Sequence, residues 1–381
     1  MAPHDPTPLD FSALDLDRRL YEAIETRGFL KTTPIQSATF SLIQQGLDVI
    51  ACAQTGTGKT LAFLLPLLQR FLLAPADAER RPSTRVLVLA PTRELASQIE
   101  DDFTGFAYGT HLSSIAVYGG VGANPQAQGL RAPADFVVAT PGRLLDHLRA
   151  GIARFEDLEV LVLDEADRML DMGFWPDVRR IVSDLPVGRQ TLFFSATMSD
   201  DVFRSAAQIM RDPRIVRVGG GGGVAENITH CVRHVGSDDK ATWLAAFLHR
   251  SRGSALVFTR TKRGADRLGR RLAAAGVRCA AIHGDLTQGQ RTEAIEGFRS
   301  GRFTTLVATD IAARGLDIDG ISHVVNYDLP DSADSYIHRV GRTARAETTG
   351  IALTLVAVEE QDALRTIERS LKIRLQDAQP A

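Results

Sequence analysis

The chain has 381 residues, of which 44% are hydrophobic, and a formal net charge of −2. This length exceeds one ordinary domain, so we expect two domains of about 150–220 residues each. The charge excludes a generally basic nucleic-acid-binding surface. Residues 1–218 carry 22 basic against 27 acidic side chains and residues 219–381 carry 22 against 19, so any polyanion site must be local.

The composition also argues against a membrane or secreted protein. No run of about 18 apolar residues occurs, and residues 1–9 carry neither a basic region nor an apolar stretch. Cys52, Cys231 and Cys279 lie far apart without metal-ligand spacing, which favours free thiols in a reducing compartment. We therefore expect a cytoplasmic protein that does not associate with membranes.

Short apolar runs alternate with helical patterns along the whole chain. Strands separated by helices indicate parallel sheets whose faces are covered by helices, an α/β fold. The runs that predict buried strands are 47–52, 86–89, 136–139, 160–163 and 191–194 in the first half, and 255–258, 277–282, 304–308, 323–327 and 351–356 in the second.

Five consecutive glycines occupy residues 219–223, where neither a helix nor a strand is favoured. This run predicts a flexible linker over 219–226. The linker would join an N-terminal domain, residues 1–218, to a C-terminal domain, residues 227–381.

Residues 53–60 are typical of a phosphate-binding loop, since they follow a predicted strand and precede apolar residues at helical spacing over 61–71. Glycines in such a loop let backbone N–H groups point at phosphate oxygens, the lysine reaches the terminal phosphates, and the last hydroxyl holds Mg²⁺. A glycine- and threonine-rich surface turn is the alternative, and Ala53 replaces the usual first glycine. The loop comprises Ala53, Gln54, Thr55, Gly56, Thr57, Gly58, Lys59 and Thr60.

A second motif, Asp164-Glu165-Ala166-Asp167, directly follows the predicted strand 160–163. Acidic residues at the carboxyl end of a parallel strand lie where α/β sheets bind ligands. Asp164 could hold Mg²⁺, through water, and Glu165 could orient or deprotonate an attacking water. The alternative is that these acids only cap the following helix.

Together the two motifs resemble those of the DEAD-box ATP-dependent RNA helicases, and the resemblance extends from about Phe11 to Val356. The second half is most similar to the bacterial RhlE-type branch. Further matching motifs, in family order, are 91–96 (PTRELA), 119–120 (GG), 140–143 (TPGR), 195–197 (SAT), 308–310 with 314–317 (ATD, RGLD) and 338–345 (HRVGRTAR). The resemblance implies two tandem RecA-like domains, with ATP and Mg²⁺ bound in a cleft between them.

Residues 9–37 resemble the family's adenine-reading segment. A glutamine amide donates and accepts at once, so Gln36 suits the N6 and N7 positions of adenine, and Phe29 and Thr33 lie beside it. Without the family, Phe29 would be core packing and Gln36 a solvated helix residue. Thr32 stands where the family usually has proline, and we expect this change to soften the loop.

The motif at 338–345 implies a contribution of the second domain to the nucleotide site. By resemblance, Arg342 and Arg345 act as arginine fingers on the γ-phosphate and Asp317, with Gly315, binds the ribose. His338 and Arg339 resemble inter-domain couplers, and Ser195 and Thr197 would link the phosphate site to RNA. A solvated basic helix face is the alternative for 338–345.

The family also implies RNA contacts through the backbone, which carry no base preference. The residues implied are Pro91, Thr92, Arg93, Gly119, Gly120, Thr140 and Arg143 in the first domain, and Thr259, Thr261, Arg291 and Thr309 in the second. The arginines at 263, 267, 270 and 271 are explained as a solvated helix face, and His230 and His283 as structural residues.

The predicted function is therefore an ATP-dependent RNA helicase that clamps RNA and unwinds short duplexes locally. An ATP-gated RNA clamp and a DNA-directed motor are the alternatives. We expect a monomer whose partners are RNA and, by resemblance, ribosome-assembly or RNA-decay factors.

Overall fold

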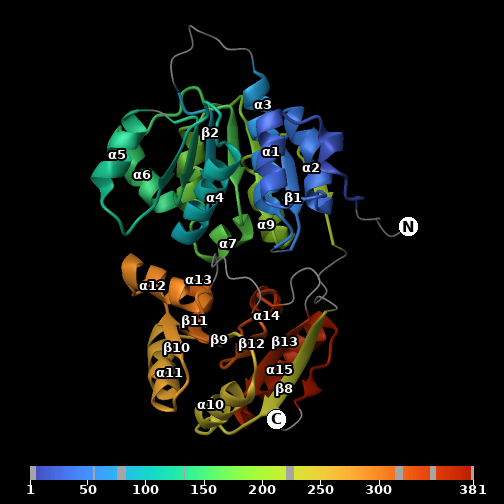
Figure 1. The fold of residues 1–381 in the computed structure, drawn as a ribbon, viewed down its shortest axis with the longest axis vertical. Coiled ribbons are helices and arrows are strands. Elements are labelled where there is room, and N and C mark those ends of the chain that lie inside the picture. The colour runs from blue at the N-terminus through green and yellow to red at the C-terminus, as the bar shows by residue number, and fades with distance from the viewer. Residues whose placement is uncertain are drawn as a thin grey trace. The chain divides into compact units, whose positions relative to one another are not determined.

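The computed structural model describes residues 6–54, 56–74, 83–132, 134–219, 227–313, 321–343 and 349–378. The chain forms two compact units, Met1–Gly221 (unit 1) and Gly222–Ala381 (unit 2), shown in Figure 1. The division between them falls inside the predicted linker, whose residues 220–226 lie outside the described ranges.

Unit 1 is built on a seven-stranded parallel sheet with the order β3-β4-β2-β5-β6-β1-β7. Its strands are β1 (Val49–Cys52), β2 (Val86–Leu89), β3 (Ser114–Val117), β4 (Phe136–Ala139), β5 (Val160–Leu163), β6 (Gln190–Ser195) and β7 (Arg214–Arg217). Its helices are η1 (Phe11–Leu14), α1 (Arg18–Thr26), α2 (Pro34–Gln44), α3 (Lys59–Leu73), α4 (Arg93–Phe106), α5 (Ala123–Arg131), α6 (Pro141–Arg149), α7 (Ala166–Asp171), α8 (Trp175–Ser183) and α9 (Asp200–Ala207).

Unit 2 contains a second seven-stranded parallel sheet, with the order β10-β11-β9-β12-β13-β8-β14. Its strands are β8 (Ile228–His234), β9 (Ala255–Thr259), β10 (Cys279–Ile282), β11 (Thr305–Thr309), β12 (His323–Asn326), β13 (Gly350–Val356) and β14 (Gln376–Asp377). Its helices are α10 (Lys240–Arg250), α11 (Lys262–Ala274), α12 (Gln288–Arg299), α13 (Asp310–Ala313), α14 (Ala333–Val340), η2 (Val358–Glu360) and α15 (Gln361–Leu371).

The two sheets share one strand order, since β8 to β14 occupy in unit 2 the places that β1 to β7 occupy in unit 1. In both sheets, therefore, the loops after the first, fifth and sixth strands are neighbours at the carboxyl edge. The loops after the second, third and fourth strands form a separate neighbouring group. Ligands of parallel α/β sheets bind at this edge.

Each sheet is covered by helices on both faces, as its strand sequences require. In β2, Val86 and Val88 face one apolar layer while Leu87 and Leu89 face the other, and all four are fully buried. In unit 2, Phe258 and Val257 of β9 likewise belong to opposite layers. None of the described helices is long and apolar enough to cross a membrane.

The predicted fold class is confirmed, with three strands at the predicted residues, 86–89, 136–139 and 160–163. Four strands were missed, namely β3, β7, β8 and β14. β7 and β14 are largely exposed and β3 is only half-buried, because edge strands need apolar residues on fewer sides. In β8 only Ile228 and Val232 are buried, so the strand lacks a continuous apolar run.

Candidate nucleotide and RNA site

The predicted phosphate loop joins β1 to α3, and its glycines adopt a conformation that other residues avoid. Gly56 and Gly58 have φ angles of 80° and 82°. A Cβ atom on Gly58 would lie 2.4 Å from Nε2 of Gln36, so a side chain here would collide with the adenine-reading segment. Thr55 lies outside the described residues.

Lys59 begins α3 and is buried. Its Nζ donates to the carbonyl oxygen of Ala53 at 2.7 Å, which folds the lysine over the loop it follows. Thr57 donates to the carbonyl of Gln54 at 2.7 Å, and Thr60 is the second residue of the helix. The loop thus combines a helix N-terminus, left-handed glycines and an ammonium group, as phosphate binding requires.

Asp164 directly follows β5 and is only 2% exposed. Burial, and then the nearby Glu165 carboxylate, raise its pKa to about 7, although Lys59 opposes this shift. Its Oδ1 accepts from the N–H of Glu165 at 2.9 Å, which holds the carboxylate in place. A desolvated oxygen ligand of this kind fits Mg²⁺.

Glu165 has a left-handed backbone, with φ at 51°, and forms an ion pair with Arg168 of α7. Its side chain makes no capping hydrogen bond to α7, so the helix-cap alternative fails for this residue. Backbone strain of this kind is often found at functional sites.

Asp167 connects the acidic motif to the segment after β6. Its Oδ2 accepts from the N–H groups of Ala196 and Thr197 at 3.1 and 3.0 Å and from Thr197 Oγ1 at 3.1 Å. Ser195 donates to the carbonyl of Thr197 at 2.7 Å. The sequence alone allows a helix cap for Asp167 and carries no local signal of this connection.

The predicted adenine-reading segment lies against the phosphate loop. Gln36 is 7% exposed, so the solvated alternative for it is wrong, and Phe29 is 46% exposed, so core packing is wrong for Phe29. Gln36 Oε1 accepts from the N–H of Thr33 at 2.8 Å and its Nε2 donates to the carbonyl of Gly58 at 3.1 Å. Thr32 is buried and hydrogen-bonded to Leu9, and the expected softening of the loop stays a prediction.

The RNA residues predicted in unit 1 gather after β2, β3 and β4, the second group of carboxyl-edge loops. The Arg93 side chain lies so close to the 119–120 turn that a Cβ on Gly120 would be 1.7 Å from its Nη1. Arg143 donates to the carbonyl of Val121 at 3.2 Å. Pro91 and Thr92 precede α4, where Thr92 accepts from the N–H of Leu95, and Thr140 precedes α6.

The RNA residues predicted in unit 2 take corresponding places. Thr259 ends β9 and Thr309 ends β11, while Thr261 caps α11 by accepting from the N–H of Gly264 at 3.0 Å. Arg291 lies on α12, 8% exposed, with Nη1 3.5 Å from the carbonyl oxygen of His283.

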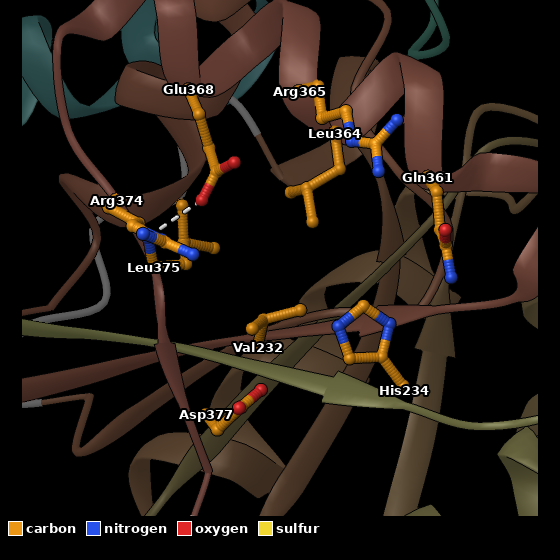
Figure 2. A pocket seen from close by; sticks show the side chains of 9 residues that line it. All are labelled: Val232, His234, Gln361, Leu364, Arg365, Glu368, Arg374, Leu375 and Asp377. Atoms are coloured by element: carbon orange, nitrogen blue, oxygen red, sulfur yellow. Dashed lines mark hydrogen bonds between the residues drawn. The ribbon is translucent and has the colours of Figure 1, made fainter.

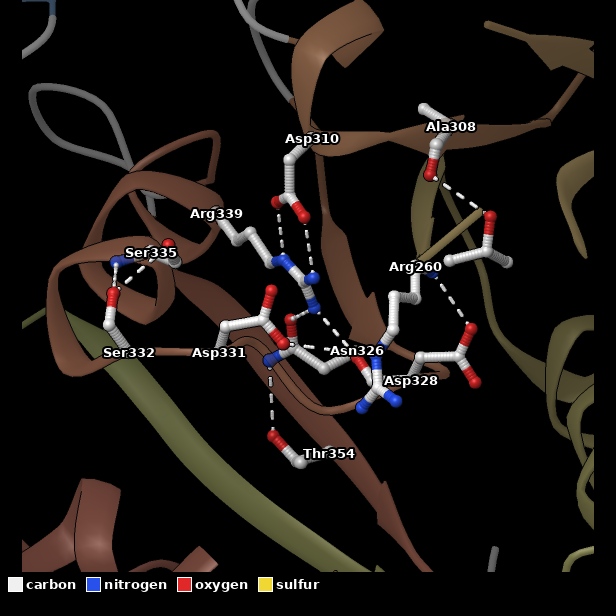
Figure 3. A network of polar contacts seen from close by, with 11 residues as sticks. Arg260, Ala308, Asp310, Asn326, Asp328, Asp331, Ser332, Ser335, Arg339 and Thr354 are labelled. Atoms are coloured by element: carbon white, nitrogen blue, oxygen red, sulfur yellow. Dashed lines mark hydrogen bonds and ion pairs between the residues drawn. The ribbon is translucent and has the colours of Figure 1, made fainter. Parts of the chain in front are cut away.

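Arg339 of α14 is the centre of a polar network inside unit 2 (Figure 3). It is 2% exposed, and its guanidinium donates two hydrogen bonds to the Asp310 carboxylate, at 2.6 and 2.7 Å. Its Nη1 also donates to Asn326 Oδ1 and to the carbonyl of Asp328. The structure therefore places this predicted coupler within one unit. Asp310 belongs to the matching motif 308–310, but the sequence analysis assigned it no role; an acid directly after a buried strand was the signal.

The other residues of the 338–345 motif are only partly described. His338 lies on α14 beside Arg339, and Arg342, 6% exposed, follows one turn later. Gly315, Asp317 and Arg345 lie outside the described residues.

Unit 2 also has a cavity of about 300 Å³ beside β8 and α15 that no predicted site residue lines (Figure 2). Its lining combines the apolar Val232, Leu364 and Leu375 with His234, Gln361, Arg365, Glu368, Arg374 and Asp377. Within the described part of the chain, no group of three His, Cys, Asp or Glu residues is arranged to hold a metal ion.

His230 in β8 is a half-buried histidine whose Nδ1 lies 2.8 Å from the Tyr336 hydroxyl. Burial lowers its pKa from 6.5 to about 4. Because the unfolded chain binds the proton more readily, we expect the stability that neutral His230 provides to be complete above pH 6.5 and to decline toward pH 4.

Urea unfolding of unit 2 at pH 7.5 and pH 5 tests this expectation, with Trp243 as the fluorescent probe in a Trp175→Phe background. The His230→Phe variant should be less stable at pH 7.5 but lose less stability on acidification than the parent. His111→Gln, at an exposed histidine, is the control. Equal losses in the His230 variant and its parent would contradict the assignment.

A phosphate loop after β1 and paired acids after β5, at the same carboxyl edge with only β6 between the two strands, define a nucleoside-triphosphate-binding unit of RecA-like type. The family model for the DEAD/DEAH box helicase matches residues 33–205, and the model for the helicase conserved C-terminal domain matches residues 239–347. The chain belongs to the DEAD-box ATP-dependent RNA helicases.

Individual relatives agree over nearly the whole chain. The ATP-dependent RNA helicase CshA of Listeria monocytogenes is 41% identical over 97% of this chain and 70% of its own length. CshA of Geobacillus kaustophilus is also 41% identical, over 97% of this chain and 78% of its own length. The similarity to these relatives does not test the resemblance to the RhlE-type branch, which stays a prediction.

Solved structures are similar as well. Dbp5 of S. cerevisiae bound to RNA and ADP BeF3 superposes with a TM-score of 0.87 at 31% identity, over 97% of this chain and 95% of Dbp5. Mss116p bound to ssRNA and AMP-PNP superposes with a TM-score of 0.88 at 27% identity, over 100% of this chain and 82% of the Mss116p chain.

Proposed function

We propose that this chain hydrolyses ATP in response to RNA and uses the cycle to clamp RNA and separate short duplexes. The observation that carries the proposal is the arrangement of unit 1. The loops after β1, β5 and β6 hold the nucleotide candidates, and those after β2, β3 and β4 hold the RNA candidates, along one edge of one sheet. The Dbp5 and Mss116p structures, with RNA and nucleotide analogues, support the same pairing of ligands.

In this proposal the chain's own residues position ATP and its attacking water. Backbone N–H groups at Gly56 and Gly58 and the Lys59 ammonium bind the phosphates. Thr60 and Asp164 would hold Mg²⁺, which when bound neutralises phosphate charge and orients the leaving group. Glu165 orients and deprotonates the water, and Gln36 with Phe29 recognises adenine.

RNA would be bound through its backbone. Glycines 119 and 120 let a phosphate approach closely, and Arg93, which lies against them, and Arg143 supply positive charge. The corresponding threonines of unit 2 would bind the next nucleotides. Contacts to phosphates and 2′-hydroxyls would favour RNA over DNA without a base preference.

The two units would act on one ATP, with Arg342 and Arg345 of unit 2 stabilising the charge that develops on the γ-phosphate. Asp167 offers a path between the sites, because it joins the acidic motif to Ser195 and Thr197. RNA held by both units would be bent, and since a duplex cannot follow the bend, a few base pairs open. A cytoplasmic monomer that acts with ribosome-assembly or RNA-decay factors is part of the same proposal.

Duplex length gives the direct test. Each opening disrupts only a few pairs, and the remainder must melt spontaneously at about 1.4 kcal/mol per stacked step, the average for DNA. Strand release at saturating ATP should therefore slow by orders of magnitude as several pairs are added. ATPase with single-stranded DNA in place of RNA is the control and should stay near the unstimulated rate. Release nearly independent of length would indicate translocation, and equal stimulation by DNA would indicate a DNA motor.

A further inference from the structure

The N-terminal segment of unit 1 is attached at two points to elements that build the nucleotide site. Phe11 is buried in the core, 3% exposed. Further along, Gln69 of α3, the helix that Lys59 begins, accepts from the N–H of Asp17 at 2.7 Å and donates to the carbonyl of Asp15 at 2.9 Å. The hydrogen bonds of Gln69 to Asp15 and Asp17 are the first attachment, and they are remote from the phosphate loop.

The second attachment is Thr32, which makes three hydrogen bonds to one residue. Its Oγ1 accepts from the N–H of Leu9 at 2.8 Å and donates to the carbonyl of Leu9 at 3.2 Å, and its own N–H donates to that carbonyl at 2.8 Å. An antiparallel bridge between Asp10 and Lys31 continues the pairing. Thr32 is 2% exposed, so water does not compete for these bonds. The proline usual in the family at this position has neither the hydroxyl nor the N–H.

From Thr32 a short chain of hydrogen bonds leads to the phosphate loop. The next residue, Thr33, donates its N–H to Gln36 Oε1, and Gln36 Nε2 donates to the carbonyl of Gly58. Gly58 directly precedes Lys59 and has no room for a side chain. A displacement of Thr32 would therefore move the Gln36 amide and loosen the loop that holds the phosphates.

We propose that the Thr32 hydroxyl is a positioning residue that sets the affinity for ATP by fixing the adenine-reading segment against the phosphate loop. The inference rests on the proposed function, because it concerns the same nucleotide site. Among the described residues, the hydrogen bonds of Thr32 run to Leu9 and not to the groups that activate water or stabilise phosphate charge, so turnover at saturating ATP should not depend on it.

Three variants distinguish a positioning role of the Thr32 hydroxyl from a role in the stability of unit 1 alone. Thr32→Val removes the hydroxyl and keeps the shape, and Thr32→Ser restores the hydroxyl. Thr39→Val is the matched control, since Thr39 is also a buried threonine, on α2 with Gln36. Its Oγ1 is bonded to the carbonyls of Ile35 and Ala62, outside the path from Leu9 to Gly58. For each full-length variant we would measure KM and kcat with RNA, the Kd for ADP by calorimetry, and the Tm.

Thr32→Val should raise KM for ATP and Kd for ADP about threefold to tenfold, the range expected from losing the net contribution of a hydrogen bond. Its kcat should stay within about twofold of wild type, and Thr32→Ser should return both constants close to wild type. Thr39→Val should lower Tm without changing either constant. If Thr32→Val lowers Tm with unchanged KM and Kd, the hydroxyl is structural only and the inference is wrong. Failure of the proposed function would be distinct, because wild type itself would then show no RNA-stimulated turnover.

Discussion

Replacing Glu165 by glutamine should lower RNA-stimulated ATP turnover about 10²–10⁴-fold, the contribution typical of a general base. An amide has nearly the same shape as a carboxylate but cannot take a proton from water. The phosphate loop and Asp164 are untouched, so ATP and RNA should still bind. The variant should accumulate as a complex with both ligands.

The control for Glu165 is another ion-paired glutamate at the opposite end of the same strand. Glu159 precedes β5 and pairs with Arg85 at 2.8 Å, whereas Glu165 follows β5 and pairs with Arg168. Glu159→Gln should therefore lose the ion pairs with Arg85 and, at 3.9 Å, with Arg70, and little stability, with normal turnover. Single-turnover hydrolysis and nucleotide binding would be measured for both. Turnover of Glu165→Gln near the wild-type rate would remove this residue from the catalytic role.

Replacing Arg342 by alanine should lower turnover about 10³–10⁵-fold, the effect of losing an arginine finger. The guanidinium is needed when charge moves onto the phosphate oxygens, so kcat should fall far more than nucleotide affinity. Arg342→Lys should recover little, because an ammonium cannot form the planar fork of two hydrogen bonds.

Since Arg342 is 6% exposed, unfolding of unit 2 must be excluded by melting curves for both variants. Arg270→Ala, on the exposed face of α11, is the matched control for loss of an arginine and should leave turnover unchanged. A folded Arg342→Ala protein that hydrolyses ATP within about tenfold of wild type, far from the loss expected of a finger, would contradict the assignment.

Sequence alone determined the α/β class and the residue types of the site. Central strands such as β2, β4 and β5 are buried on both faces, so each is a continuous apolar run that can be read locally. The phosphate loop and the acids that follow β5 can also be recognised locally, because a turn that binds phosphate and the end of a strand each occupy a few consecutive residues. Edge strands such as β7 bury too little surface to leave this pattern.

Tertiary structure decided which of these residues touch. Asp310 meets Arg339 across 29 positions, Asp167 meets Thr197 across 30, and Leu9 meets Thr32 across 23. Such pairs carry no local periodicity, since a hydrogen bond between distant residues depends on how helices and strands pack. Thr32 shows the difference most clearly. Its departure from proline predicts a softer loop, and only the structure shows that its buried hydroxyl bonds Leu9 within the segment that lies against the phosphate loop.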